Sequence, residues 1–346
     1  MVKPITRRDM VRFSIAALGG IGVSGISGCA SNSPSSGAGS SIKNSVEQLE
    51  EIEVADDFIM SFVVMSDSHV RPDNERNIEH FRNALTDISD MERKPDSIVM
   101  VGDITDSGDA EEYDLVRQIA SDVGFDFDID FIKVMGNHEQ YRSESEPELS
   151  ADDERHLRFM EQAGVGSIYY DLEIEGQHMI CLGPDESLTG SWVLFNFSDA
   201  QMEWLEDLLN RDSAEGKTSY VFCHEPLFDT VRNTGKGSWA EGHSLEDNDE
   251  LAKIVEGRPN VIFFSGHTHL YPDIARPDED GPLYVNDGAC GPGQLAPNVR
   301  DYATGFVGSF GWLVSVYKNG VVFQARDFLQ HSWIDELRYE YRPHFG

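Results

Sequence analysis

Carboxylate, imidazole and amide side chains recur at five points of the chain, each directly after an apolar run. The segments are Asp67-Ser68-His69, Gly102-Asp103, Gly136-Asn137-His138-Glu139, Cys223-His224-Glu225 and Gly266-His267-Thr268-His269. These groups bind metal ions and transfer protons. Any one segment alone would be an ordinary polar turn. However, five of the eleven histidines fall at these points, which random placement would rarely produce, so we expect a shared site.

Seven of these residues are candidate metal ligands. They are Asp67, His69, Asp103, Asn137, His224, His267 and His269. Their oxygen and nitrogen donors, without a thiolate, suit zinc, iron or manganese. Seven ligands exceed the number that one tetrahedral ion takes. We therefore expect two divalent or trivalent metal ions, bridged by Asp103 because it lies centrally in this order.

A pair of metal ions indicates phosphate-ester hydrolysis. Two ions about 3.5–4 Å apart clamp a phosphate group and generate a hydroxide nucleophile near neutral pH, so no serine or cysteine nucleophile is required. His138 follows the candidate ligand Asn137 and could protonate the leaving oxygen as a general acid. The predicted catalytic residues are therefore His138 and Asp103.

Apolar runs and helical spacing alternate along the chain and predict the elements that carry these residues. Strands are expected at 58–65, 97–101, 131–135, 220–222, 261–264, 283–285 and 312–316. Apolar residues three and four apart predict helices over 78–88 and 109–121. Ser198 and Gln201 predict a capping-box start for another helix, and Lys318-Asn319-Gly320 predicts a hairpin turn. This alternation indicates an α/β sandwich with a mixed sheet core, in which ligand-binding loops lie at the carboxyl ends of strands.

The motifs together resemble those of the calcineurin-like metallophosphoesterase family. The matching pieces are D-S-H from Asp67, G-D at Asp103, G-N-H-E from Gly136, His224 and G-H-T-H from Gly266, and they span about residues 58–287. The resemblance implies a four-layer fold of two mixed β-sheets packed as a sandwich flanked by helices. It implies a dinuclear centre with His138 beside the substrate phosphate. One ion would be held by Asp67, His69, Asp103 and His269, and the other by Asp103, Asn137, His224 and His267.

The N-terminal residues predict export. Residues 1–29 resemble a twin-arginine signal, with Arg7 and Arg8, although Met10 stands where phenylalanine is common. The segment ends at a lipobox-like Cys29, whose lipidation would hold the protein on the outer face of the cytoplasmic membrane. The alternative is that Cys29 is incidental and the signal is cut nearby. Residues 30–56 are expected to form a flexible linker, and residues 57–346 a single domain that includes a C-terminal β-hairpin.

The charge balance restricts the partners. The chain of 346 residues carries 62 acidic and 27 basic residues, for a net charge of −35. Such a surface repels nucleic-acid backbones, so no nucleic-acid duplex is expected as a partner. The excess of acid suits either a high-salt habitat or simply an acidic exported protein.

The predicted function is therefore that of an exported metal-dependent phosphoesterase acting on a small-molecule or lipid phosphate ester. An acidic rim offers few cations for a dianionic phosphate, which favours phosphodiesters over monoesters. One alternative is a phosphomonoesterase or nucleotidase with the same dinuclear site. A further alternative is a lipoprotein that binds metal or ligand without turnover. The expected macromolecular partners are the membrane surface and the export machinery for folded proteins.

Overall fold

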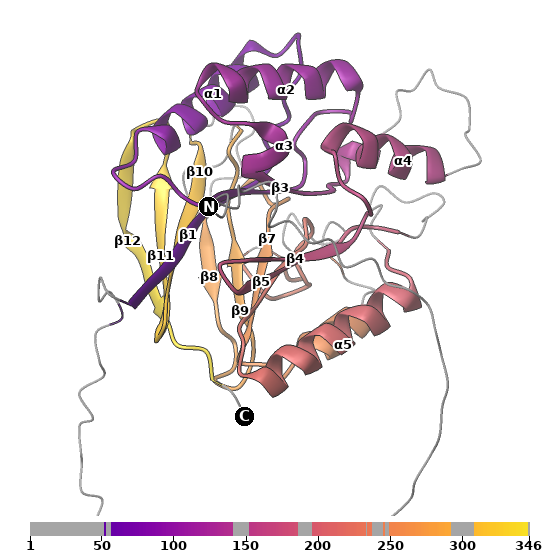
Figure 1. The fold of residues 1–346 in the computed structure, drawn as a ribbon, viewed down its shortest axis with the longest axis vertical. Coiled ribbons are helices and arrows are strands. Elements are labelled where there is room, and N and C mark those ends of the chain that lie inside the picture. Colours follow the sequence, from indigo (N-terminus) through magenta and orange to yellow (C-terminus); the bar gives the residue numbers. More distant parts are fainter. Residues whose placement is uncertain are drawn as a thin grey trace, which may run out of the picture.

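The computed structural model describes residues 52, 57–140, 152–185, 196–232, 234–236, 245, 249–291 and 308–344. The expected signal segment 1–29 and all of the expected linker 30–56 except Ile52 lie outside these residues, so both stay predictions. Two six-stranded β-sheets pack face to face, with helices on their outer sides (Figure 1). This is the predicted α/β sandwich of two mixed sheets, and the fold prediction is confirmed.

The first sheet combines a parallel half with an antiparallel half. Its strand order is β12-β11-β10-β1-β2-β3. The bounds are β1 Phe58–Met65, β2 Ser97–Val101, β3 Phe131–Val134, β10 Phe310–Tyr317, β11 Gly320–Asp327 and β12 Ser332–Tyr341. Strands β1, β2 and β3 run parallel, whereas β10, β11 and β12 add on as antiparallel strands. The predicted turn at Lys318-Asn319 joins β10 to β11, and Tyr317 pairs with Gly320 across it.

The second sheet has four parallel strands at its centre and an antiparallel strand at each edge. Its order is β4-β5-β6-β7-β9-β8. The bounds are β4 Tyr170–Ile174, β5 Gln177–Cys181, β6 Ser219–Phe222, β7 Val261–Ser265, β8 Asp273–Ala275 and β9 Leu283–Asn286. The sequence patterns did not predict β4, β5, β8 and β12. Strands β4 and β8 are only partly buried and β12 is largely exposed, so they lack the continuous apolar runs of the central strands.

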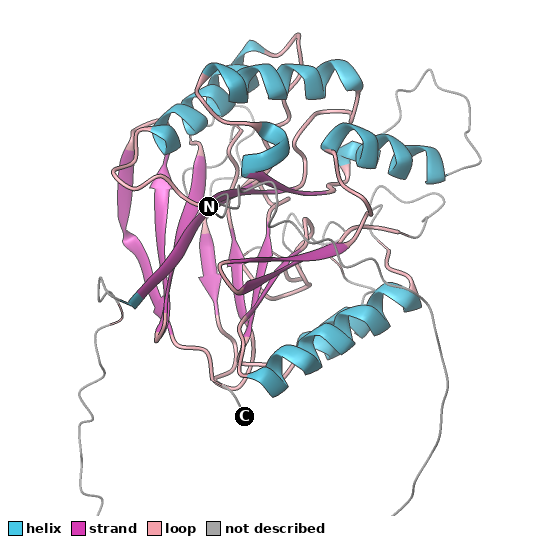
Figure 2. Ribbon diagram, in the orientation of Figure 1, coloured by secondary structure: helices cyan, strands magenta, loops and turns pink. Residues whose placement is uncertain are grey.

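Helices cover the outer faces of both sheets (Figure 2). Their bounds are α1 Glu75–Ser89, α2 Ala110–Asp122, α3 Phe127–Asp130, α4 Asp152–Ala163, α5 Asp199–Glu215 and α6 Asp249–Val255, with a short 3-10 helix at His138–Gln140. Helices α1, α2 and α4 pack on the first sheet, and α5 and α6 pack on the second. Within the described ranges, no helix combines the length and the apolar character needed to cross a membrane.

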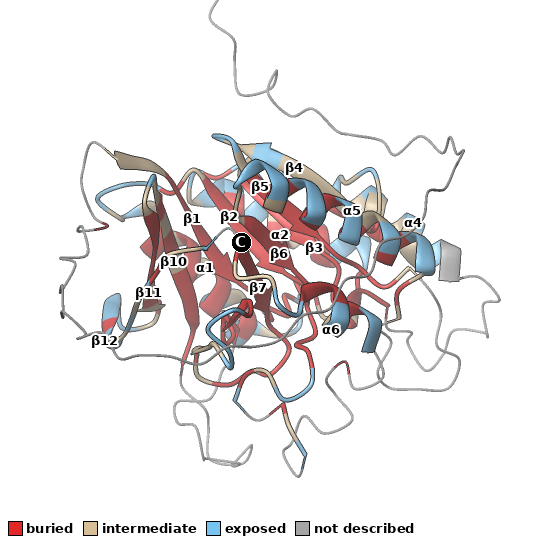
Figure 3. Cartoon of the chain, turned by 90° about the horizontal axis from the view of Figure 1, so that it is seen from below, coloured by how far each residue is buried: buried red, intermediate tan, exposed pale blue. Residues whose placement is uncertain are grey.

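Side-chain alternation along the strands builds three apolar layers. On β1, Phe62 and Val64 lie between the two sheets, whereas Val63 and Met65 face the helices. Successive strand residues point to opposite faces, so a strand buried on both faces must be apolar throughout. Figure 3 shows the strands as the buried part of the molecule, with exposed residues on the outer sides of α4 and α5. This packing holds the strand ends rigidly at one rim.

Helix α5 begins with half of the predicted capping box. Ser198 Oγ accepts a hydrogen bond from Gln201 N at 3.1 Å, as an N-cap serine should. The Gln201 amide, however, donates to Gly183 O at 2.8 Å and to Asp185 Oδ1 at 2.7 Å. Ser198 N instead donates to Asp185 Oδ1 at 2.8 Å. The reciprocal half of the box is therefore replaced by contacts to the residues after β5.

Candidate metal centre

The five motif segments follow β1, β2, β3, β6 and β7, and their side chains meet at the carboxyl ends of these strands. Backbone hydrogen bonds join the segments to one another. Asp67 N donates to Gly102 O at 3.2 Å, His69 N donates to Asp103 O at 3.1 Å, and Gly266 N donates to His224 O at 3.0 Å. The structure therefore places all seven candidate ligands in one cluster that draws on both sheets.

One group of donors surrounds the carboxylate of Asp67. The donor atoms of Asp67, His69, Asp103 and His269 all lie within 4.8 Å of one another. His269 Nε2 lies 3.0 Å from His69 Nε2 and 3.1 Å from Asp67 Oδ1, and His69 Nε2 lies 3.7 Å from Asp103 Oδ2. Two imidazoles and two carboxylates converge on one point, which is a donor set suited to a divalent ion.

A second group surrounds His224. Asp103, His224 and His267 form a group with the same 4.8 Å spacing. His224 Nε2 lies 3.2 Å from Asp103 Oδ2, and Asn137 Oδ1 lies 3.1 Å from His224 Nε2 and 3.0 Å from His267 Nδ1. Asp103 is common to both groups, which is the position a bridging carboxylate must take. The donor sets fit two metal ions, although the ligand roles themselves remain predictions.

Backbone conformation singles out the same residues. Asp67, His69, Asp103, His267 and His269 have φ values of 52°, 43°, 47°, 64° and 51°, respectively. They are five of the eight non-glycine residues with positive φ among the described residues. Each such residue costs conformational energy, and such strain clusters at functional sites. The tight turns that follow these strands aim the side chains at one another.

Burial and neighbouring charges set the protonation of the imidazoles. Burial lowers the pKa of His69 and of His267 to about 3, so both rings are neutral and offer a lone pair. His224 differs: burial opposes its charge, but Asp103 and Asp67 raise its pKa to about 10. His224 Nδ1 lies 2.6 Å from Val101 O. Because a carbonyl can only accept, Nδ1 carries the proton of this hydrogen bond, and Nε2 faces the other candidate ligands. A cation in the cluster would neutralise the same two carboxylates.

His138 lies beside the shared carboxylate and is only partly buried. Its Nε2 is 4.0 Å from Asp103 Oδ2. Its Nδ1 donates to Asp106 O at 2.8 Å, because a backbone carbonyl can only accept. The Asp106 carboxylate lies 3.8 Å from both His138 Nδ1 and His69 Nδ1, and it accepts from Arg71 at 2.9 Å. Sequence reasoning missed Asp106, although the segment G-D-I-T-D presents it three residues after Asp103.

Glu139 is a second residue whose role was missed. Its buried carboxylate accepts backbone N–H groups from Asp103 at 3.0 Å, Thr105 at 3.0 Å and Gly136 at 2.7 Å. Gly136 packs so tightly that a Cβ there would clash with the Asp103 amide. Glu139 therefore holds the loop after β2 against the loop after β3. The G-N-H-E motif contained the signal, but only the fold shows which amides the carboxylate reaches.

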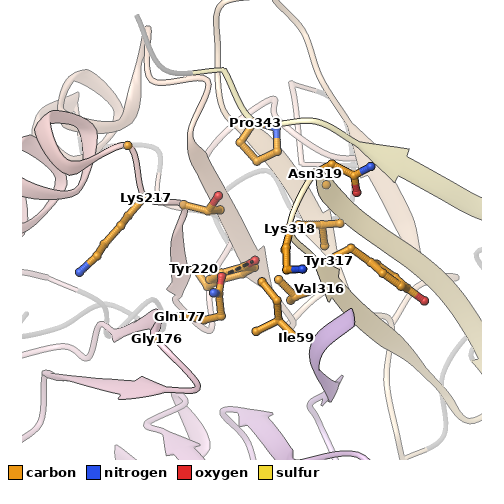
Figure 4. Close-up of a pocket in the computed structure, with 14 residues that line it drawn as sticks. Ile59, Gly176, Gln177, Lys217, Tyr220, Val316, Tyr317, Lys318, Asn319 and Pro343 are labelled. Atoms are coloured by element: carbon orange, nitrogen blue, oxygen red, sulfur yellow. Dashed lines mark hydrogen bonds between the residues drawn. The ribbon is translucent and has the colours of Figure 1, made fainter. Parts of the chain in front are cut away.

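A separate cavity of about 270 Å³ lies away from this cluster (Figure 4). It is lined by the β10–β11 turn with Lys318, by Gly176 of the β4–β5 turn, by Lys217 after α5, and by the early strand residues Ile59 and Tyr220. These residues stand at the amino ends of β1 and β6, whereas the clustered side chains follow the carboxyl ends. None of the seven candidate ligands lines this cavity.

Family comparison agrees with the site. Residues 60–271 match the model of the calcineurin-like phosphoesterase family, which is more than half of the chain. The protein therefore belongs to the calcineurin-like phosphoesterase family, and the family prediction is confirmed.

Individual relatives are distant. A probable cyclic nucleotide phosphodiesterase of Rhodococcus erythropolis is 26% identical over 188 residues, which cover 54% of this chain and 56% of that protein. A probable glycerophosphodiester phosphodiesterase of Arcobacter nitrofigilis is 27% identical over 173 residues, covering 48% of this chain and 57% of that protein. The chain thus spans little more than half of the length of these relatives.

A solved structure shows the same fold. The crystal structure of a dimetal phosphatase from Danio rerio superposes with a TM-score of 0.57 at 14% identity. The superposition covers 83% of this chain and all of that chain. At this identity, the likeness concerns the arrangement of sheets and helices alone.

Proposed function

We propose that the protein is a metal-dependent phosphoesterase that hydrolyses phosphodiesters. One observation carries the proposal: seven oxygen and nitrogen donors from five loops converge at one rim, and Asp103 is shared between two donor groups. Family membership supports the same class of reaction. The names of the two phosphodiesterase relatives support the choice of a diester.

The seven candidate ligands divide into two sets, which share Asp103. Asp67, His69, Asp103 and His269 would hold one ion, and Asp103 would share the second ion with Asn137, His224 and His267. Manganese, iron and zinc all suit these donors. When bound, such ions neutralise charge on the phosphate and lower the pKa of water.

His138 supplies the remaining group that the chemistry needs. The Asp106 carbonyl fixes the proton on Nδ1, so the charged ring carries its second proton at Nε2, on the side of Asp103. That proton passes to the leaving oxygen. Because the ring is only partly buried, a substrate can reach it.

The rim favours substrates with a single negative charge. Arg71 reaches the Asp106 carboxylate beside the cluster, and its guanidinium is already paired with Asp73 and Asp106. A phosphodiester carries one charge, whereas a monoester carries close to two. Charge repulsion from the acidic surface therefore disfavours the monoester, although bound ions reduce the difference.

Hydrolysis of two chromogenic esters tests the proposal. The full chain with manganese should cleave bis(p-nitrophenyl) phosphate faster than p-nitrophenyl phosphate. His267→Ala should abolish most of the diester cleavage, because a candidate ligand of one ion is lost. His344→Ala is the matched control, since His344 is exposed and its replacement should not change the rate.

Faster cleavage of the monoester would favour the phosphatase alternative. If two ions bind but neither ester is cleaved, a binding protein becomes the better reading.

We also propose that the protein is exported and anchored through Cys29. The support is the sequence pattern of residues 1–29 alone. Cell fractionation should find the native chain in the membrane fraction, and Cys29→Ser should release it into the extracytoplasmic soluble fraction. Replacing both Arg7 and Arg8 with lysine should leave the chain in the cytoplasm. If Cys29→Ser fractionates like the native chain, lipidation at this residue is wrong.

A further inference from the structure

A sixth polar segment lies at the same rim and begins with the last residue of β9. Residues 286–291, Asn-Asp-Gly-Ala-Cys-Gly, are buried throughout. Asp287 N donates to Ser265 O at 2.9 Å, and Cys290 N donates to Ser66 O at 2.9 Å. Ser66 follows β1 of the first sheet and Ser265 ends β7 of the second. The segment therefore joins the two sheets immediately behind the candidate ligands.

The carboxyl group of Asp287 contacts the residue that precedes the candidate ligand Asp67. Its Oδ1 lies 2.6 Å from Ser66 Oγ, and Ser66 Oγ also forms a short hydrogen bond with Asp67 Oδ2. The other oxygen of Asp287 is buried and has no hydrogen-bond partner among the described residues. All three side chains are buried. One serine hydroxyl thus links two buried carboxyl groups.

The hydroxyl of Ser66 has one proton, so it can donate to only one of these carboxyl groups. Asp67 is the acceptor, because its Oδ2 also accepts the N–H of His267 at 2.9 Å and its Oδ1 faces His269 Nε2 at 3.1 Å. The second oxygen of Asp287, in contrast, has no hydrogen-bond partner among the described residues. Burial and then the charge of Asp67 raise the pKa of Asp287 well above its usual value. Both hydrogen bonds form only when a neutral Asp287 donates to Ser66.

We propose that Asp287 is a positioning residue of the metal centre, which donates a hydrogen bond to Ser66 and so holds the serine hydroxyl on Asp67. The link fixes the direction in which the Asp67 carboxylate faces the other donors. This proposal rests on the proposed function, because it takes Asp67 as a metal ligand. Hydrogen-bonding partners of metal ligands typically contribute about 10–100-fold to metal affinity.

Manganese binding to the metal-free full chain, measured by isothermal titration calorimetry, tests the link. Asp287→Asn keeps the shape and can still donate to Ser66, so its affinities should stay within about threefold of wild type. Asp287→Leu removes the donor and should weaken at least one ion by about 10–100-fold. Asp87→Asn is the matched control: Asp87 is also a buried carboxylate, but it pairs with Arg326 at 2.7 Å, elsewhere in the fold. Its variant should bind manganese like wild type.

Ser66→Ala removes the hydroxyl that accepts the hydrogen bond from Asp287. This variant tests the same link if Asp287→Leu does not fold. The melting temperature of each metal-free variant reports folding. Ser66→Ala should weaken the same ion, and the double variant with Asp287→Leu should bind no worse than the weaker single variant, because both act through one link. If Asp287→Leu or Ser66→Ala binds manganese with wild-type affinity, the proposal is wrong. It is also wrong if Asp287→Asn loses as much affinity as Asp287→Leu. A wild-type chain that binds manganese without hydrolysing any ester would contradict the proposed function alone.

Discussion

At the scale of single residues, the imidazole of His138 has two distinct sides. Nδ1 is occupied by the Asp106 carbonyl at 2.8 Å, and Nε2 faces Asp103 at 4.0 Å. A ring held in this way can deliver a proton in one direction only. Among the clustered imidazoles, His69, His224 and His267 are buried, whereas His138 and His269 are partly exposed. The partly exposed ring of His138 is therefore placed for contact with a substrate.

The role of His138 can be separated from metal binding by the choice of leaving group. His138→Gln should lower the rate of cleavage by about 10²–10⁴-fold for a diester with an alkyl leaving group, because general-acid catalysis is lost. The loss should be much smaller for p-nitrophenolate, which departs without a proton. Steady-state rates for the two substrates measure the difference. Bound manganese, counted by metal analysis, should stay at the wild-type level. Equal losses for both leaving groups would contradict an acid role.

At the scale of secondary-structure elements, a buried charged network joins helix α5 to three strands of the second sheet. His178 on β5 contacts Asp212 on α5 at 2.5 Å and Asp171 on β4 at 3.1 Å. Ser219 on β6 donates to the same Asp212 oxygen at 2.7 Å. Burial opposes a charge on His178, but the hydrogen bonds that its ring donates to Asp171 and Asp212 raise its pKa to about 9. The charged imidazole thus holds α5 against the sheet.

This network should make stability depend on pH above neutrality. The folded-state pKa of about 9 exceeds the unfolded value of about 6.5. The stabilisation is therefore complete below about pH 6.5 and is lost as the pH rises through 9. We expect a loss of about 3 kcal/mol across this window, at about 1.36 kcal/mol per pKa unit. Urea unfolding in EDTA at pH 6, 7.5 and 9 measures it. His178→Gln should remove most of this dependence of the unfolding free energy on pH. If the variant and the wild type lose the same free energy between pH 6 and 9, His178 is not the origin of the effect.

At the scale of the whole molecule, the net charge of −35 opposes the compact state, because like charges repel. Part of the acidic surface is locally compensated, as in the pair between Lys217 and Glu173 at 3.3 Å. With 62 acidic against 27 basic residues, most acidic side chains have no basic partner available. The repulsion is therefore a property of the entire surface and no single substitution removes it.

Salt should consequently stabilise the protein. Raising sodium chloride from 0.1 to 1 M shortens the Debye length from about 10 to about 3 Å. We expect the melting temperature to rise by about 5 °C, which corresponds to roughly 2 kcal/mol for a domain of this size. Differential scanning calorimetry in EDTA measures the shift. Potassium chloride should act alike, since screening depends on ionic strength. A melting temperature that stays constant or falls would show that self-repulsion is small.

The chain's local patterns were enough to predict the candidate ligands and every central strand except β5, whose apolar run is only Met179-Ile180-Cys181. An apolar run that ends in aspartate or histidine, as at Met65 and Asp67, is visible in a few consecutive residues. The carboxyl ends of parallel strands meet at one rim by geometry, so Asp67, Asp103 and His267 could be grouped without a structure. The same reasoning missed edge strands such as β4 and β12, because their partly exposed residues lack that signature.

Neighbours along the chain were therefore enough to indicate the family, most of the alternation of strands and helices, and the candidate donor residues. Tertiary structure alone decided which residues support those donors. Glu139 reaches amides 34 and 36 residues away, and Asp287 reaches Ser66 across 221 residues. The positive φ values of five of the seven candidate ligands likewise became visible only in the folded loops. Contacts between distant segments follow from how the sheets face each other, and no local pattern encodes that arrangement.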